Sequence, residues 1–219
     1  MSIFLNEDIA EVVGAFIGDG CLSRHYDSRG SGAWREVVMF TGAWDKDSGY
    51  YKCIIKPTID RYIGAKFTVY HRMDDDTVRF MSHDKKIVTF LLDLGFKFGP
   101  KCDDVSIPDA IMSKYDLKLG CLRGIFNTDG SIYRRYGKKF RNHSKHYSSY
   151  KVVQFKLNSR VLTYQIRDIL AEMNLTPNRV ITESKCSVCR ITSQDKIRIF
   201  NEKINTTHRY HIERAKHIK

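Results

Sequence analysis

A short motif occurs twice in this chain, and this repeat constrains the fold more than any other feature. Residues 13–24 and 123–134 each contain Gly, then Phe, then Asp-Gly, an aliphatic residue and Arg at matching positions. A single Asp-Gly pair is expected about once by chance in a chain of this size. Two copies with matching flanks indicate an internal repeat that keeps one carboxylate per copy, Asp19 and Asp129.

The repeat extends beyond the motif. Residues 36–41 resemble residues 151–156, and residues 79–85 resemble residues 190–196, in the same order in both halves. We therefore predict an α+β protein with two pseudo-symmetric αββαββα halves and antiparallel sheets. The predicted division is an N-terminal half at 1–99, a connecting segment at 100–113, and a C-terminal half with a basic tail at 114–219.

Hydrophobic periodicity places the elements within each half. Asn6 is the expected N-cap of the first helix. Helices are predicted at residues 7–18, 48–63, 83–94, 115–128, 159–173 and 194–204. Strands are predicted at residues 34–42, 66–72, 77–82, 131–136, 150–157 and within 179–193.

Each motif helix contains two glycines four residues apart. Gly14 and Gly18 lie in the first, and Gly120 and Gly124 in the second. Glycine inside a helix costs about 1 kcal/mol relative to alanine, so their presence needs a reason. Small residues at this spacing let two helix backbones approach closely. If the two helices pack together, their terminal carboxylates emerge side by side.

The charge balance favours a polyanionic partner. The net charge is +12 and the pI is about 9.4. Nucleic acid is the first candidate, because each phosphate neutralised by Lys or Arg adds affinity. An anionic membrane surface would require a basic amphipathic helix, which the sequence lacks, and no segment has the length of a membrane span.

The paired motifs resemble those of the LAGLIDADG homing endonucleases in their two-motif monomeric form. Residues 12–20 resemble the first motif and residues 122–130 the second; residues 106–108 and 158–162 also fit. The resemblance implies motif helices at the interface of two halves, saddle-shaped sheets on DNA, and divalent metal held by one acidic residue per motif. It also implies metal contacts from the carbonyl oxygens of Gly18 and Thr128. The chain departs from the family pattern at Asn127, where Asp is frequent, and we expect little effect.

Phosphodiester hydrolysis gives the same residues a chemical role. Asp19 and Asp129 supply hard oxygen ligands for Mg²⁺ or another divalent cation. A basic residue near each site would polarise water or neutralise charge. Lys156 is the candidate in the second half, whereas its counterpart Thr41 is not basic, so the two sites are expected to be unequal. Arg24 and Arg134 are alternatives, and each basic residue has a phosphate contact as its simpler role.

Residues 133–151 form the clearest nucleic-acid-binding segment, since they are rich in basic and aromatic residues and contain no Asp or Glu. A two-stranded ribbon of this kind fits a major groove. Other basic residues on predicted strands are expected to contact bases or phosphates. The candidate DNA-binding residues are Arg24, Arg35, Arg72, Arg79, Arg134, Arg135, Lys138, Lys139, Arg141, Lys151, Lys185 and Arg190.

Two patterns resemble metal sites without meeting their requirements. Cys186 and Cys189 form one Cys-x-x-Cys pair, but a structural zinc site needs four ligands. The His-containing residues 207–211 are expected to form a basic surface tail instead.

Three functions from different classes fit these features. The favoured one is a site-specific, metal-dependent double-stranded DNA endonuclease, monomeric, intron-encoded and located in the cytoplasm or an organelle of the intron's host. The alternatives are an RNA-binding maturase that assists its host intron, and a DNA-binding regulator that has lost cleavage. Both Asp19 and Asp129 are present, which argues against the regulator. The target sequence is not encoded in any recognisable pattern.

Overall fold

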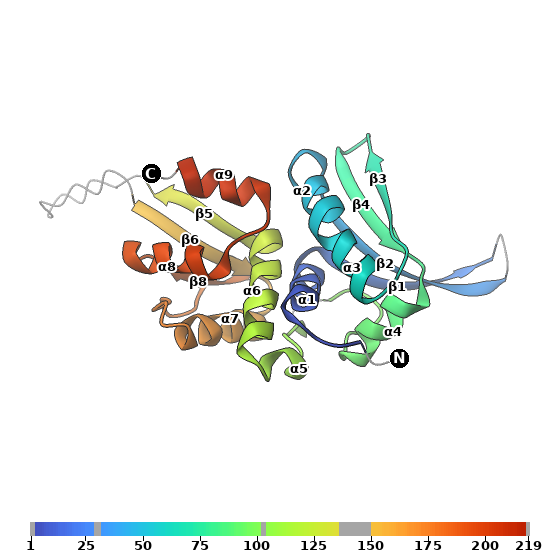
Figure 1. Ribbon diagram of the computed structural model, residues 1–219, viewed down its shortest axis with the longest axis horizontal. Coiled ribbons are helices and arrows are strands. Elements are labelled where there is room, and N and C mark those ends of the chain that lie inside the picture. Colours follow the sequence, from blue (N-terminus) through green and yellow to red (C-terminus); the bar gives the residue numbers. More distant parts are fainter. Residues whose placement is uncertain (1–2, 29–31, 102–103, 136–149, 218–219) are drawn as a thin grey trace, which may run out of the picture.

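Two α/β halves lie side by side in the computed structural model, which describes residues 3–28, 32–101, 104–135 and 150–217. Figure 1 shows helix α1 (Glu7–Asp19) and helix α6 (Tyr115–Asp129) next to each other at the centre, with one sheet on either side. Across the described residues, no helix combines the length and apolarity needed to cross a membrane.

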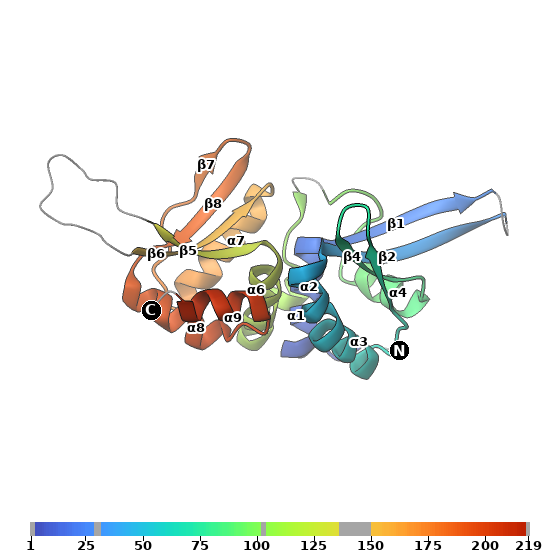
Figure 2. The ribbon, with the colours of Figure 1, turned by 90° about the horizontal axis from the view of Figure 1, so that it is seen from above.

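The first half follows the predicted order of elements. After α1 come β1 (Gly20–Asp27), β2 (Ala33–Ala43), a helical stretch, β3 (Thr68–Arg72), β4 (Thr77–Ser82) and α4 (Lys85–Asp93). The helical stretch was predicted as one helix, but it consists of α2 (Trp44–Tyr50), the π-helical turn η1 (Tyr51–Ile55) and α3 (Lys56–Tyr62). The long β1–β2 hairpin projects away from the centre of the molecule (Figure 2).

The second half repeats this order after the short helix α5 (Asp109–Met112). It contains α6, β5 (Gly130–Arg135), β6 (Tyr150–Leu157), α7 (Arg160–Glu172), β7 (Ile181–Glu183), β8 (Cys186–Ile191) and α8 (Gln194–Ile204). A further helix, α9 (Arg209–His217), follows. The α+β class and the αββαββα order of each half are confirmed.

The two antiparallel sheets share one topology. Their strand orders are β1-β2-β4-β3 and β5-β6-β8-β7. The motif glycines pair with equivalent residues, Gly20 with Phe40 and Gly130 with Phe155. The following residues, Thr41 and Lys156, are therefore equivalent, as predicted.

The predicted match between residues 79–85 and 190–196 is wrong by two positions. Phe40 pairs with Phe80, whereas Phe155 pairs with Cys189. Arg79 is therefore equivalent to Val188 rather than to Arg190. A shift of two residues preserves the alternation of a strand, so the sequence pattern did not reveal the error.

The motif helices begin and end as their sequences require. The Asn6 side chain accepts a hydrogen bond from the Ile9 amide at 2.9 Å and caps α1. At the other end, Gly20 and Gly130 leave the helical conformation and start the first strand of each sheet. Each motif aspartate is consequently the last residue of its helix, directly beside a sheet.

Helices α1 and α6 touch through their glycines. A Cβ atom at Gly14 would overlap the backbone carbonyl of Cys121, and one at Gly124 would overlap the carbonyl of Glu11. A Cβ atom at Gly18 would overlap the Thr128 side chain. Only hydrogen atoms fit in these positions, so the glycine spacing sets the distance between the two halves.

A buried polar network lies beside this contact. Arg123 of α6 forms ion pairs with Glu7 and Glu11 of α1, and its Nε donates to the Ile204 carbonyl oxygen at 2.6 Å. Asn127 donates to Glu11 Oε1 at 3.1 Å and to Thr207 Oγ1 at 2.9 Å. Asn127 thus connects both halves to the C-terminal segment, a structural role that the sequence did not indicate.

The expected basic surface tail is wrong for residues 207–211. His208 and His211 are buried, and α9 packs against β5 and α2. His208 Nε2 lies 3.0 Å from Asp47 Oδ1 of the first half. Burial lowers the pKa of His211 to about 4, with the His208 charge acting in the same direction. His208 is thus an interface residue and His211 packs against Phe126 of its own half, whereas composition alone indicated solvent exposure for both.

We predict that Gly14→Ala destabilises the protein by on the order of 3 kcal/mol, because the added methyl group must push the α6 backbone away. Chemical denaturation measures the change. Gly49→Ala is the matched control: Gly49 is also helical, and a Cβ atom there meets nothing within 4 Å. This control should be neutral or up to about 1 kcal/mol more stable. Equal stability of the two variants would contradict the described helix contact.

Candidate active site

Asp19 and Asp129 come together where α1 and α6 end. A Cβ atom placed on Gly18 would lie 3.2 Å from Asp129 Oδ2, so the second carboxylate reaches the end of the first helix. The two carboxylates interact electrostatically, and Asp129 raises the pKa of Asp19. The predicted convergence of the carboxylates is therefore present in the structure.

Asp19 is an unusual carboxyl group. Its partial burial raises its pKa to about 7, and the nearby Asp129 and Asp47 carboxylates add to the shift. A hydrogen bond from the Tyr51 hydroxyl to Asp19 Oδ2, 2.6 Å long, and the charge of Lys101 oppose it. Desolvation also raises the pKa of Asp129, against the charge of Lys101. Asp129 is more open to solvent than Asp19, and water moderates its shift.

Lys101 places a positive charge beside both carboxylates. Its ammonium donates three hydrogen bonds to the carbonyl oxygens of Phe16, Ile17 and Gly18, at 2.7, 2.6 and 2.7 Å. These are carbonyls at the C-terminal end of α1, where the helix dipole favours a cation. Burial lowers the pKa of Lys101 to about 8, and the charges of Asp129 and Asp19 limit the decrease.

Sequence analysis did not identify Lys101, which lies in the predicted connecting segment. The last turn of α1 carries no basic residue of its own, and this was the one sequence signal that could have suggested a cation from elsewhere. Which lysine would supply it depends on the path of the chain between the halves. The Gly18 carbonyl, predicted to bind metal, is already a hydrogen-bond acceptor for this lysine.

A cavity of about 330 Å³ opens beside Asp129. Its lining includes Gly18, Lys101, Asp129, Lys156 and Asn158. Lys156, the predicted basic residue of the second half, therefore shares a cavity with one of the two motif carboxylates. Its side chain is exposed, which leaves the ammonium accessible to a phosphate.

The first half has a basic residue at the same level of its sheet, but on a different strand. Thr41 of β2 pairs directly with Arg79 of β4, whereas Lys156 of β6 pairs with Val188 of β8. Paired residues in an antiparallel ladder project from the same face. Each half thus presents one basic side chain on this pair of strands, Arg79 in the first half and Lys156 in the second. The two halves therefore differ less in charge than the comparison of Thr41 with Lys156 predicts.

Each sheet has one face covered by helices and one open face. Phe40 and Phe155 point into the core, so by alternation Thr41 and Lys156 point to the open face. Four other candidate DNA-binding residues share this face: Arg35, Arg72, Arg79 and Arg190. Several already have acidic partners, since Arg35 pairs with Asp27, Arg72 with Asp74 and Asp75, and Arg190 with Glu183.

Other candidates are not brought to the open face. Arg24 and Arg134 lie two residues after the core residues Leu22 and Ile132 and therefore share their helix-covered face. Lys151 pairs with Arg134 and lies on the same face. The Arg24 guanidinium lies over the rings of Trp34 and Phe98, 5.0 and 5.2 Å from their centroids. The Arg24 guanidinium is thus packed on aromatic rings, and a catalytic role for Arg24 or Arg134 stays a prediction.

The remaining candidates are not assigned a face. Lys185 occupies the exposed turn between β7 and β8. Lys138, Lys139 and Arg141, and the side chain of Arg135, lie outside the part of the chain that the structure describes. Their DNA-binding roles stay predictions.

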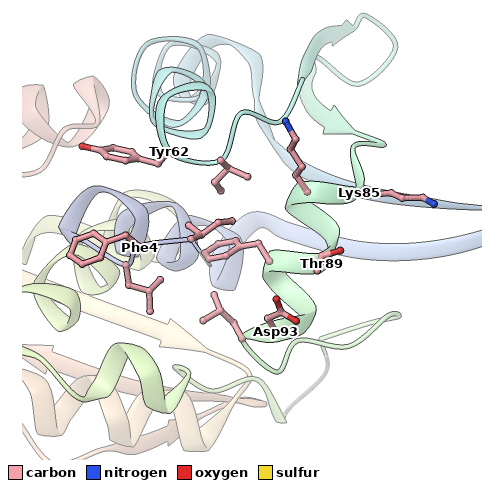
Figure 3. A pocket seen from close by; sticks show the side chains of 11 residues that line it. Phe4, Tyr62, Lys85, Thr89 and Asp93 are labelled. Atoms are coloured by element: carbon pink, nitrogen blue, oxygen red, sulfur yellow. The ribbon is translucent and has the colours of Figure 1, made fainter. Parts of the chain in front are cut away.

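Two further features lie apart from the carboxylates. Cys186 and Cys189 are three residues apart on β8, so alternation places them on opposite faces and they cannot share a metal ion. A cavity of about 630 Å³ lies between the N-terminal segment, α3 and α4 (Figure 3). Its lining combines Phe4, Phe90 and other apolar side chains with Lys85 and Asp93, and it contains neither motif aspartate.

The chemistry of the donor set fits a hard divalent cation. Two carboxylates and the Gly18 carbonyl oxygen lie in the site, and all are oxygen ligands. Among the described residues, no group of three or more His, Cys, Asp or Glu side chains is placed to hold a metal. Mg²⁺ does not require such a group, because it commonly binds through one or two carboxylates and completes its shell with water and substrate phosphates.

Comparison with known proteins agrees with this geometry. Residues 116–205 match the family model described as a LAGLIDADG-like domain. The structure of I-DmoI in complex with DNA and Mn superposes with a TM-score of 0.63 at 14% sequence identity, covering 92% of this chain and 98% of that one. The chain has the two-motif LAGLIDADG fold.

Two other LAGLIDADG structures superpose over both halves. The I-LtrWI homing endonuclease bound to target DNA gives a TM-score of 0.63 at 14% identity, covering 95% of this chain and 88% of that one. The meganuclease I-AabMI bound to uncleaved DNA gives 0.60 at 10% identity, covering 92% and 83%. No curated protein matches the chain by sequence. The LAGLIDADG architecture is therefore shared while most side chains differ.

The raised pKa of Asp19 predicts a pH-dependent effect of Asp19→Asn on stability. The folded-state pKa of about 7 lies above the ordinary value of 3.8. Ionisation of Asp19 therefore costs folding free energy progressively as the pH rises from about 4 to 7, and the full cost is present above that range.

Asp19→Asn should consequently stabilise the metal-free protein at about pH 8, by on the order of 2 kcal/mol after allowance for partial exposure, and have little effect near pH 4. Denaturant melts at both pH values measure the difference. An equal effect at the two pH values would show that Asp19 titrates normally.

Proposed function

We propose that the chain is a site-specific endonuclease that hydrolyses both strands of duplex DNA with a divalent cation. One observation carries this proposal: the two motif carboxylates converge at the end of the closely packed helices, and each is followed at once by a sheet with an open face. Two pseudo-equivalent carboxylates suit two DNA strands of opposite polarity. The solved structures with this fold include proteins described as bound to DNA with Mn or Ca.

The chain's own residues have separable tasks in this reaction. Asp19 and Asp129, with the carbonyl oxygens of Gly18 and Thr128, would hold the metal. Bound between such ligands, divalent metal supplies Lewis acidity at the attacking and leaving oxygens. Lys101 balances part of the negative charge of the two carboxylates, because its ammonium interacts with both.

Two basic side chains, Lys156 and Arg79, act on the substrate. Lys156 lines the cavity beside Asp129 and neutralises the charge of a scissile phosphate placed there, or orients the attacking water. Arg79, opposite Thr41, performs the corresponding task in the first half. The net charge of +12 attracts the DNA backbone irrespective of sequence.

The biological setting follows from the same proposal. Because both half-sites belong to one chain, the protein acts as a monomer on a long duplex site. We infer an intron-encoded enzyme with Mg²⁺ as the cation, located in the cytoplasm or in an organelle that contains the host gene. No feature of the described residues favours an intron RNA partner. The converging carboxylates have no use in a regulator that only binds DNA.

Removal of either carboxylate should abolish double-strand cleavage and leave DNA binding largely intact. Asp19→Asn and Asp129→Asn preserve the side-chain shape while removing a metal ligand. The measurement is cleavage of a plasmid library with randomised sites in Mg²⁺, followed by cleavage of the selected site. Cleavage by either variant at the rate of the unaltered protein would refute the metal-binding assignment.

Removal of one basic side chain should slow cleavage of one DNA strand more than cleavage of the other. Lys156→Met is expected to accumulate nicked circles before linear product, and Arg79→Met to slow the opposite strand. Thr41→Val should matter less than either, since its side chain carries no charge. Strand-specific end labelling at saturating protein separates the two strands.

If Lys156 only contacts a phosphate, both strands will slow together and excess protein will restore the rate. Such full rescue would reduce Lys156 to a DNA-binding residue. The same test applies to Arg79, and the two variants serve as controls for each other.

A further inference from the structure

Tyr51 makes a direct contact with a motif carboxylate. Its hydroxyl donates to Asp19 Oδ2 at 2.6 Å and lies 3.5 Å from the Thr41 carbonyl oxygen. The ring is fully buried, stacked on Phe80 at 5.9 Å between centroids and tilted against Phe40 at the same distance. The hydroxyl therefore has a fixed direction, and among the described residues it is Asp19 Oδ2 that accepts a hydrogen bond.

The local backbone explains why Tyr51 points there. Tyr51 is the first residue of the π-helical turn that separates α2 from α3. An extra residue in a helical turn rotates the side chains that follow it, and such turns are frequent at functional sites. The neighbouring Tyr50 is also buried, but its hydroxyl donates to Glu11 Oε1 at 3.1 Å, away from Asp19.

The second half has no equivalent contact. The corresponding helix, α7, is a regular α-helix without a π turn, and its buried residues include a single hydroxyl, that of Thr163. This hydroxyl donates to the Ser159 carbonyl oxygen at 2.8 Å. Within the described part of the chain, no hydrogen bond reaches the Asp129 carboxylate, so the two pseudo-symmetric carboxylates are held differently.

We propose that Tyr51 is a positioning residue that fixes the Asp19 carboxylate, with Oδ2 engaged and Oδ1 presented to the divalent cation. This inference rests on the proposed nuclease function. Because Asp129 lacks such a partner, the two halves of the active site differ in metal affinity, and Tyr51 determines the difference. The geometry supports this role because the hydrogen bond to Asp19 is short and the tyrosine ring is buried between Phe80 and Phe40.

The test compares Tyr51→Phe with Tyr50→Phe in Mn²⁺ titrations. Both changes remove one buried hydroxyl from adjacent tyrosines, but only the first removes a contact with Asp19. Strand-resolved cleavage should show that Tyr51→Phe raises the Mn²⁺ concentration for half-maximal cleavage of one strand by about tenfold, the scale of a hydrogen bond to a charged group. The other strand should change less than about twofold, and Tyr50→Phe should leave the ratio of the two midpoints unchanged.

Mn²⁺ binding is also measured without turnover. Electron paramagnetic resonance of free Mn²⁺ follows binding to the protein alone and to its complex with a duplex that has non-cleavable linkages at both cut positions. Tyr51→Phe should weaken one class of bound Mn²⁺ and leave the other. This measurement decides the role of Tyr51 even if the unaltered protein cuts no DNA, an outcome that would overturn the proposed function instead.

Denaturant melts separate positioning from folding. Tyr51→Phe keeps the contacts with Phe40 and Phe80 and should remain folded; if it does not, Tyr51→Met, which also lacks the hydroxyl, takes its place. The proposal is overturned if Mn²⁺ affinity and the strand ratio match those of the unaltered protein. It is equally overturned if Tyr50→Phe produces the same shift, or if both strands change together in proportion to lost stability.

Discussion

The close contact between α1 and α6 is the constraint on which the rest of the structure depends. Gly14, Gly120 and Gly124 leave room for backbone against backbone, and Gly18 leaves room for the Thr128 side chain; a Cβ atom at any of the four would overlap the facing helix. This contact brings two carboxylates together from distant parts of the sequence. It also fixes where each sheet begins, because β1 and β5 start at the residues that follow the aspartates. Loss of this contact would therefore move the two carboxylates apart as well as destabilise the fold.

The converging carboxylates oppose folding in the absence of a cation. Partial burial and mutual repulsion raise the pKa of Asp19 to about 7, which means that the ionised form is unfavourable in the folded protein. Lys101 and Tyr51 offset part of this cost, one by charge and one by a hydrogen bond. A bound divalent cation would offset a larger part of this free-energy cost. The two carboxylates are thus held close together at a cost in folding stability, a trade-off that is common for functional groups.

The pseudo-symmetry of the backbone does not extend to the side chains around the site. The same sheet register places Lys156 on β6 in one half and Arg79 on β4 in the other. A π turn supplies Tyr51 to Asp19, and His208, directly before helix α9, reaches across the interface to Asp47. One scaffold therefore carries two chemically different halves, which is a physical basis for cutting two strands at different rates.

The sequence by itself determined the repeat, the α+β class, the order of elements and the motif carboxylates, because periodicity and glycine spacing are local properties. It also placed Thr41 and Lys156 at equivalent positions. Tertiary structure alone decided that Lys101 caps α1, that Tyr51 contacts Asp19, that Arg79 lies opposite Thr41, and that His208 and His211 are buried. Each of these depends on strand register, a helical irregularity or the path of a connecting segment, and these arise from packing between residues far apart in the chain.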